Sequence, residues 1–130
     1  MLGRMEGLTK AEENIMQVLW RIEKGFIRDI LEQFPEPRPK YSTVSTITRI
    51  LENKGFVGHR AYGKSHQYFP LIAKDDYARA FLGRLLHDYF GGSFKSLVHF
   101  FSKQQDLDVR EVEEVIEMLE DVSTRKRGRK

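Results

Sequence analysis

The chain has 130 residues, of which 40% are hydrophobic and 32% are charged. This composition is typical of a globular chain with one domain, or one domain and an appendage, and it excludes disorder throughout. Cysteine is absent, which excludes disulfides, thiolate metal sites and cysteine nucleophiles. The first ten residues lack the pattern of a secretion signal and no apolar run of about 18 residues follows, so we expect a cytoplasmic protein without membrane insertion.

The net charge of +3 is divided unevenly along the chain. Residues 1–73 carry a net charge of +3, residues 74–122 carry −5, and residues 123–130 carry +5. Within the first block, the segment from Arg38 to His66 holds six lysines and arginines against one carboxylate. Such a concentration is typical of a surface that binds a polyanion, although a solvated basic surface is the alternative.

Two amphipathic helices are predicted before the first proline. Thr9 and Glu12 have the spacing of a capping box, with Leu8 as its hydrophobic staple, and they predict a helix that begins near residue 10. Its apolar stripe recurs every three or four residues and consists of Ala11, Ile15, Val18, Leu19 and Ile22. The prolines at 35, 37 and 39 end a second, shorter helical pattern, which contains Ile27, Ile30, Leu31 and Phe34.

A third helix is predicted from Ser42, as its N-cap, to about Asn53, with Gly55 placed where a left-handed terminating residue belongs. Its buried stripe is expected to consist of Val44, Ile47, Ile50 and Leu51. The opposite face is expected to present small hydroxyl side chains and one long cation, in the set Thr43, Ser45, Thr46, Arg49 and Glu52. Because β-branched threonine is a mediocre helix former, contact on this outward face explains the composition better than helix propensity does.

Two short strand patterns follow the third helix. Residues 56–62 and 66–69 are joined through Gly63, Lys64 and Ser65, where glycine can adopt the positive φ of a type II′ turn. A hairpin of this size is marginally stable alone, so we expect it to pack on the preceding helices. Three helices followed by a hairpin predict a mainly α fold with a small antiparallel β wing. This is a winged helix-turn-helix, whose third helix enters the DNA major groove.

The third helix and the hairpin predict two kinds of DNA contact. We expect base contacts from Thr43, Thr46 and Arg49, although a phosphate is the alternative partner of Arg49. We expect phosphate contacts from residues at the start of the helix and on the hairpin, namely Lys40, Tyr41, Ser42, Arg60, Lys64 and His66. Plainer alternatives remain for three of these residues: a helix cap for Ser42, simple surface for Thr46 and a plug at the end of the core for Tyr41.

Residues 74–122 predict amphipathic helices with too few neighbours to cover them. Gly91 and Gly92 break the first, Ser93 restarts the chain, and Asp108 with Glu111 forms a capping box before the last. A second copy of the chain would supply the missing surface, whereas folding back onto residues 1–73 in a monomer is the alternative. The expected homodimer interface includes Tyr77, Phe81, Leu85, Tyr89, Leu97, Phe101, Val112, Ile116 and Leu119.

The sequence therefore predicts three parts. They are a winged-helix DNA-binding domain at residues 1–73, a helical dimerisation domain at residues 74–122 and a disordered basic tail at residues 123–130. The tail either improves solubility or contacts nucleic acid as a nonspecific arm.

Patterns for catalysis, metal binding and nucleotide hydrolysis are absent from the sequence. The four histidines, His59, His66, His87 and His99, are dispersed and form no HExxH motif. The carboxylates of the last predicted helix resemble a solvated face rather than an acid and base pair, and no phosphate-binding loop is present. We therefore expect no enzyme, no cofactor and no bound metal. The alternatives to a DNA-binding repressor are a winged helix that docks an acidic protein and a small nucleic-acid hydrolase.

Several segments together resemble the BlaI/MecI penicillinase-repressor family over about residues 8–120. They are Leu8–Glu12, Met16–Trp20, Tyr41–Val44 with Thr46, Arg49 and Leu51, Lys54–Gly55 and Tyr68–Pro70. The resemblance implies a homodimeric winged-helix repressor that binds palindromic operators, typically of TACA/TGTA type, upstream of its target genes. It also implies base contacts from Thr43, Thr46 and Arg49, with Ser42 on a phosphate.

Members of that family are released from DNA in two ways, and this chain departs from the family's pattern in both. Copper-responsive members sense the metal through cysteines near the C-terminus, and the absence of cysteine excludes this mode. β-Lactam-responsive members are cleaved at an Asn–Phe bond once a membrane sensor metalloprotease is activated. The matching bond here joins His99 to Phe100. Because histidine replaces asparagine, cleavage by such a protease is a hypothesis that rests on the resemblance alone.

Overall fold

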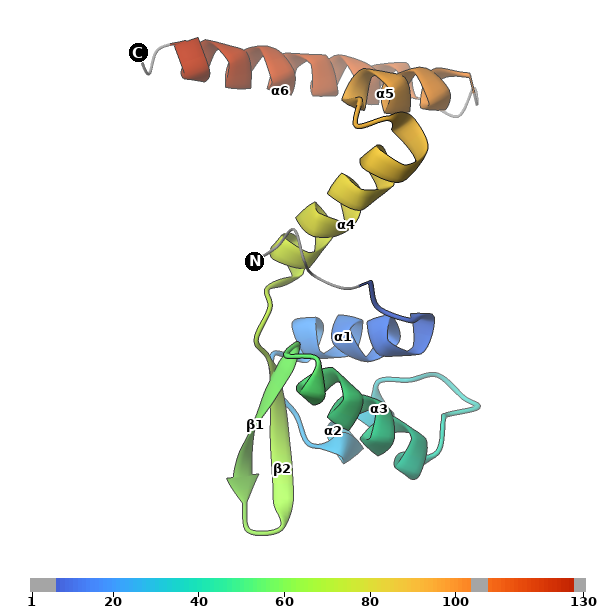
Figure 1. Cartoon of the computed structure of the whole chain (residues 1–130), viewed down its shortest axis with the longest axis vertical. Helices are drawn as coiled ribbons and strands as arrows, with labels where there is room; N and C mark the ends of the chain where they lie inside the picture. The colour runs from blue at the N-terminus through green and yellow to red at the C-terminus, as the bar shows by residue number, and fades with distance from the viewer. Residues whose placement is uncertain (1–6, 104–107, 128–130) are drawn as a thin grey trace. The chain divides into compact units, whose positions relative to one another are not determined.

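The computed structural model describes residues 7–103 and 108–127. The elements follow in the order α1 (Lys10–Ile22), α2 (Ile27–Glu32), α3 (Tyr41–Asn53), β1 (Val57–Tyr62), β2 (Ser65–Pro70), α4 (Lys74–Phe90), α5 (Phe94–Ser102) and α6 (Val109–Arg127) (Figure 1). This order confirms the predicted mainly α fold with a small antiparallel wing. The chain divides into two compact units after Leu82. In the part of the chain that the structure describes, no helix combines the length and the apolar composition that crossing a membrane requires.

The predicted capping box opens α1. The Thr9 hydroxyl accepts a hydrogen bond from the Glu12 amide at 3.1 Å, and the Glu12 carboxylate accepts one from the Thr9 amide at 2.9 Å. The interaction satisfies amides that the first helical turn would otherwise leave free. Ala11, which we assigned to the buried stripe, is exposed, because the buried face is centred on residues one helical turn further along, at Ile15, Met16, Val18 and Leu19.

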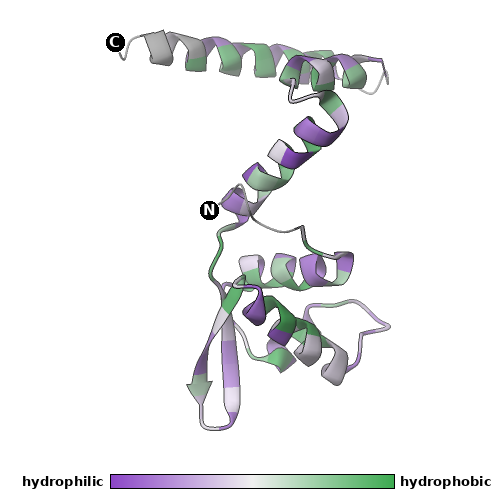
Figure 2. Cartoon of the chain, in the orientation of Figure 1, coloured by the Kyte–Doolittle hydropathy of each residue, from purple (hydrophilic) through white to green (hydrophobic). Residues whose placement is uncertain are grey.

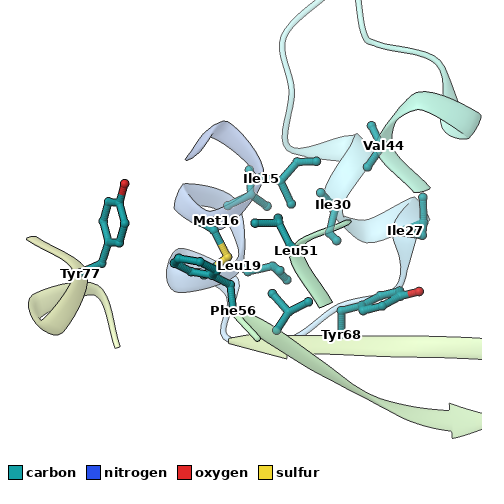
Figure 3. Close-up of a cluster of buried hydrophobic side chains, with 12 residues drawn as sticks. Ile15, Met16, Leu19, Ile27, Ile30, Val44, Leu51, Phe56, Tyr68 and Tyr77 are labelled. Carbon is teal, nitrogen blue, oxygen red and sulfur yellow. The ribbon is translucent and has the colours of Figure 1, made fainter. Parts of the chain in front are cut away.

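One hydrophobic core joins α1, α2, α3 and the hairpin. It consists of twelve buried side chains (Figure 3): Ile15, Met16, Val18, Leu19, Ile27, Ile30, Val44, Leu51, Phe56, Val57, Tyr68 and Tyr77. Their removal from water supplies the main driving force for folding of this unit. The core residues come from these elements, from Phe56 directly before β1 and from Tyr77 in α4, so the hairpin packs on the helices as predicted.

The third helix begins one residue earlier than we predicted. Its N-cap is Lys40, whose side chain makes no capping bond, so the prediction of Ser42 as the cap is wrong. The predicted buried stripe is also wrong at Ile50, which is 40% exposed. The buried position is taken instead by Thr48, whose hydroxyl donates to the Val44 carbonyl at 2.7 Å. That bond satisfies the hydroxyl inside the core.

The hairpin has a two-residue turn. Tyr62 pairs with Ser65 in the antiparallel register, so Ser65 belongs to the strand rather than to the turn, where we had placed it. Gly63 has φ +62°, as predicted for glycine at this position. The second strand also pairs with the connection between α1 and α2, since Gly25 and Tyr68 exchange two backbone hydrogen bonds of 2.9 and 2.8 Å.

The first turns of α4 belong to the same unit as the hairpin. Tyr77 is 5% exposed, and its ring centroid lies 5.9 Å from those of both Trp20 and Phe56. Its hydroxyl accepts a hydrogen bond from the Leu8 amide at 3.0 Å. We predicted Tyr77 for the dimer interface and began the second domain at residue 74. The prediction for Tyr77 is wrong, because this side chain is already buried in the core of its own unit.

The second unit contains the rest of α4, followed by α5 and α6. As predicted, α4 ends at a glycine pair with positive φ, and the Ser93 side chain caps α5 by accepting from the Ser96 amide at 3.0 Å. At the start of α6, the Asp108 carboxylate accepts from the Arg110 amide at 3.0 Å. The prediction that the chain is disordered from residue 123 is wrong as far as residue 127, because α6 continues to Arg127. Residues 128–130 lie outside the described residues.

Most apolar side chains of α5 and α6 are exposed. None of the α5 side chains is buried. Figure 2 shows hydrophobic positions alternating with hydrophilic ones along α6. The exposed apolar residues of the two helices are Phe94, Val98, Phe100, Phe101, Val109, Val115, Ile116, Met118, Leu119 and Val122. An apolar surface of this extent is typical of an interaction site.

Candidate nucleic-acid interface

The outward face of α3 carries polar side chains, all of them short except that of Arg49. Ser42, Thr46, Arg49 and Asn53 are exposed and recur at intervals of four, three and four, which places them on one face of the helix. Thr43 is also exposed, at the edge of this face. The short side chains leave the helix backbone accessible, and their hydroxyl and amide groups can donate to or accept from base edges.

The sequence reading of this face was incomplete. Ser45 and Glu52 are half-buried rather than fully outward. Asn53 was read only as the end of the helix, although its spacing of four from Arg49 would have identified it. Tyr41 is 58% exposed, so the alternative that it plugs the core is wrong.

An open groove of about 590 Å³ lies within the first unit, between α3, the hairpin and the start of α2. It brings together four of the predicted contact residues: Tyr41 and Arg49 from α3, and Lys64 and His66 from the hairpin. Ser45, which we placed on the outward face of the helix, also lines the groove, and the sequence reading missed the other lining residues, which are Phe26, Ile27, Arg28, Asp29, Tyr62, Ser65 and Tyr68. No local motif could have indicated this groove, because its walls come from segments about 40 residues apart in the chain.

The charges that line the groove favour an anion. Arg28, Arg49 and Lys64 contribute three positive charges, and Asp29 contributes one negative charge. The Asp29 carboxylate already accepts a hydrogen bond from the Phe26 amide at 2.9 Å at the start of α2. The net positive lining attracts phosphate groups, and three cations provide hydrogen-bond donors for their oxygens.

Tyr68 is a buried residue whose hydroxyl reaches this groove. The residue is 4% exposed, and Figure 3 shows its ring at the edge of the core with the hydroxyl directed away from Leu19 and Phe56. Among residues 7–103 and 108–127, no group is hydrogen-bonded to this hydroxyl, and solvent reaches its oxygen. Burial and the negative charge of Glu52 raise the pKa of the Tyr68 hydroxyl above its ordinary value. The phenol therefore keeps its proton at neutral pH and can donate it.

Two histidines of the hairpin stack on each other. The ring centroids of His59 and His66 are 4.0 Å apart and their planes differ by 8°. Nδ1 of His59 is paired with the Glu52 carboxylate at the end of α3. The Glu52 carboxylate is therefore already paired with a hairpin histidine. The His66 ring, stacked on His59, lines the groove.

The remaining predicted contact residues lie outside the groove lining. Lys40 and Ser42 are exposed at the start of α3, and Arg60 is exposed in β1. Thr43 and Thr46 are exposed on α3. The structure thus separates a polar helix face from a neighbouring basic groove, a division that the sequence reading did not make.

Two further sequence predictions have a place in the structure. His99 and Phe100, the pair that matches the family's cleavage site, are exposed in α5, where the Phe100 ring contacts the rings of Phe90 and Phe101. In the described part of the chain, no three histidine, aspartate or glutamate side chains group as metal ligands would.

A sequence model of the penicillinase repressor family matches residues 8–121. The chain belongs to this family. The methicillin resistance regulatory protein MecI of Mammaliicoccus sciuri is 28% identical over 115 residues, which cover 86% of this chain and 92% of that protein. The penicillinase repressor of Bacillus licheniformis is 25% identical over 129 residues, which cover 97% of this chain and 99% of that one.

Similarity to a solved structure supports the fold. The complex structure of hsRosR-S4 superposes with a TM-score of 0.55 at 21% identity and covers 95% of both chains. The penicillinase repressor family consists of DNA-binding transcriptional repressors and not of enzymes, and this chain is one of these repressors. The family resemblance predicted from the sequence is confirmed, and the alternative of a small nucleic-acid hydrolase is wrong.

Proposed function

We propose that this chain acts in the cytoplasm as a homodimer that binds a palindromic operator and represses transcription by occluding the promoter. The observation that carries the proposal is the exposed polar face of α3 beside a basic groove, in a chain of the penicillinase repressor family. A major groove about 12 Å wide admits a helix of this kind. The two α3 helices of a dimer would enter grooves about one helical turn, or a multiple of it, apart.

The proposed base contacts come from the exposed threonines of α3. Thr43 and Thr46 carry a hydroxyl for hydrogen bonding to base edges and a methyl group for contact with thymine. Lys40, Ser42 and Arg60, which are exposed near this face or on the hairpin, are proposed to contact phosphates. For Arg49 the sequence left base and phosphate open, and its place beside the groove favours phosphate.

The proposed dimer interface is the apolar surface of the second unit together with the exposed part of α4. Its members are exposed or half-buried in the single chain: Phe81, Leu85, Tyr89, Leu97, Phe101, Val112, Ile116 and Leu119. Pairing them across a two-fold axis removes apolar area from water, which stabilises the dimer. The acidic stretch of α6 from Glu111 to Asp121 contributes little attraction for DNA, whereas the basic segment from Arg38 to His66 lies in the first unit.

Cleavage of the bond between His99 and Phe100 by a membrane sensor metalloprotease is proposed as the route of derepression. Both residues are exposed in α5, among the side chains proposed for the dimer interface. Cleavage there would separate α6 from the rest of the chain. Incubation of the repressor with the activated protease should give two fragments, and an intact chain would exclude this route.

A gel-retardation series with two variants tests the proposed DNA contacts. Thr46→Ala should reduce the preference for a palindromic duplex with TACA/TGTA half-sites over a scrambled duplex, because it removes a base contact worth about 1–3 kcal/mol. Lys64→Ala should weaken binding to both duplexes equally and reduce the salt slope by about 1. Equal losses on both duplexes for both variants would contradict base reading by Thr46. Footprinting upstream of the protein's own gene would give the operator, its symmetry and its spacing.

A further inference from the structure

The groove between α3 and the hairpin is lined by a tyrosine with a free hydroxyl and by several cations. Tyr68 is 96% buried, yet its hydroxyl has no hydrogen-bond partner in the described ranges and is directed out of the core. No fully buried side-chain polar atom of the described residues lacks a partner, so solvent reaches this hydroxyl and it can donate to a ligand in the groove. Arg49 from α3 and Lys64 from the hairpin turn line the same groove.

We propose that this groove is a phosphate-binding site, in which the Tyr68 hydroxyl donates from the floor and Arg49, Lys64 and His66 surround the anion. The proposal deepens the proposed function, on which it rests. It assigns Arg49 to the DNA backbone and leaves sequence reading to the short side chains of α3. The inner hydroxyl is neutral and the outer groups are cationic, a combination that matches the several acceptor oxygens of a phosphate.

DNA geometry explains why a phosphate would enter at this place. The major and minor grooves of a duplex are separated by a sugar–phosphate backbone. When a helix enters the major groove and a wing reaches toward the neighbouring minor groove, that backbone must pass between the helix and the wing. In this chain the space between α3 and the hairpin is the groove that Arg49 and Lys64 flank.

The same chemistry would also accept the phosphate of a free molecule. A dianionic phosphate and a backbone phosphodiester both present oxygens to cations and hydroxyl donors. A free phosphate in this groove would compete with DNA, because both would occupy the same donors. The experiment therefore needs one arm for each source.

The DNA arm uses duplexes in which one phosphate at a time is replaced by a neutral methylphosphonate. With the wild-type chain, replacement at one position per half-site should weaken binding about tenfold, the loss expected for hydrogen bonds to a charged group. Tyr68→Phe should weaken binding of the unmodified duplex by a similar factor and show no further loss at that position, because the partner is already absent. Arg49→Ala should behave likewise, and it should preserve the ratio of affinities for palindromic and scrambled duplexes.

Tyr77→Phe is the matched control. It removes one phenol hydroxyl from a residue that is buried to almost the same degree in the same unit, but outside the groove. It should leave the methylphosphonate pattern of the wild type unchanged. Thermal unfolding followed by circular dichroism checks that Tyr68→Phe, which retains the ring in the core, is folded.

The second arm titrates inorganic phosphate into the chain without DNA at constant ionic strength, followed by the backbone amide signals of α3 and the hairpin. A methylphosphonate position that weakens binding of the wild type but causes no further loss in Tyr68→Phe supports a DNA phosphate in the groove. We call such a position coupled. If no position is coupled but inorganic phosphate shifts the groove amides of the wild type and not those of Tyr68→Phe, the groove takes a free phosphate. If neither occurs, the proposal is overturned. The proposed repressor function survives that result if specific duplex binding persists, and it fails separately if the wild type prefers no duplex.

Discussion

Glu12 is a buried carboxylate that connects two helices of the winged unit. Besides its part in the capping box, it accepts hydrogen bonds of 2.9 and 3.0 Å from the Lys54 ammonium, which directly follows α3. Burial by itself would raise the pKa of the Glu12 carboxyl, but the hydrogen bond from the Thr9 amide and the nearby Lys54 charge bring the pKa below its ordinary value. The ion pair thus holds the end of α3 against the start of α1.

Replacing this carboxylate should weaken the fold in a pH-dependent manner. Because the folded-state pKa lies below the ordinary value of 4.5, the ionised carboxylate stabilises the folded state above pH 4.5, and this contribution is lost as the pH falls through the folded-state pKa. Glu12→Gln should therefore lower the free energy of unfolding at neutral pH by about 1–3 kcal/mol. The difference from the wild type should shrink at acidic pH. Urea denaturation followed by Trp20 fluorescence measures both effects.

Glu13→Gln provides the comparison for Glu12→Gln. Glu13 is the next residue of α1. Its carboxylate lies 3.7 Å from the ammonium of Lys10, whose side chain is exposed. An exposed pair of this kind contributes about 0–1 kcal/mol, so the unfolding free energy should change little. Equal destabilisation by the two variants would show that the buried ion pair has no special role.

Local elements were predictable from the sequence because short-range chemistry specifies them. Thr9 with Glu12, the Gly91–Gly92 break and the Ser93 cap are decided by residues within one or two turns, and the structure confirms all three. The edges of buried stripes were less predictable. Ile50 was assigned to the core because it is apolar, but burial depends on which neighbours cover a helix, and periodicity does not contain that information.

The candidate site was predictable only in part for the same reason. The hydroxyl-rich face of α3 follows from helical spacing, so Thr43 and Thr46 could be identified as exposed. The basic groove depends on how β2 packs beside α3. Tyr68 resembled an ordinary core aromatic in the sequence, and only its position at the edge of the core reveals that its hydroxyl faces the groove.

The hairpin turn should be sensitive to the loss of its glycine. Gly63 has φ +62°, and a Cβ added there would meet no atom within 4 Å, so backbone strain alone determines the cost of a side chain. Gly63→Ala should destabilise the hairpin by about 1–2 kcal/mol. Amide hydrogen exchange in β1 and β2 should accelerate about five- to thirtyfold, while exchange in α1 changes less.

Lys64→Ala separates charge from backbone strain at the same turn. Lys64 occupies the second turn position and has no positive φ. Its replacement should leave hydrogen exchange in the hairpin nearly unchanged while reducing DNA affinity. If Gly63→Ala leaves exchange unaltered, or if Lys64→Ala accelerates it as much, the turn does not control the stability of the hairpin.

The whole chain divides its properties between two units. The first unit has a buried core and carries the basic residues from Arg38 to His66, whereas the second unit exposes large apolar side chains on α5 and α6. A surface of this kind is costly in water unless it is covered. A second copy of the same unit is the simplest cover, because two-fold pairing lets one apolar surface cover its equivalent in the partner.

Breaking the proposed pairing should weaken binding to a palindromic duplex far more than binding to a half-site. At micromolar concentration the wild type should sediment with twice the chain mass of 15.3 kDa. Ile116→Asp places a charge on an exposed apolar position of α6 and should shift the chain to the mass of one copy. A dimer binds its second half-site intramolecularly, so loss of pairing should weaken binding to a palindromic duplex by about 100-fold or more. Binding to a duplex with one half-site should change little, because the first unit is intact.

Glu117→Gln, at the neighbouring exposed position, should retain the dimer and its affinity. A wild type that sediments as a single chain, or an Ile116→Asp variant that binds both duplexes like the wild type, would contradict a role for α6 in pairing.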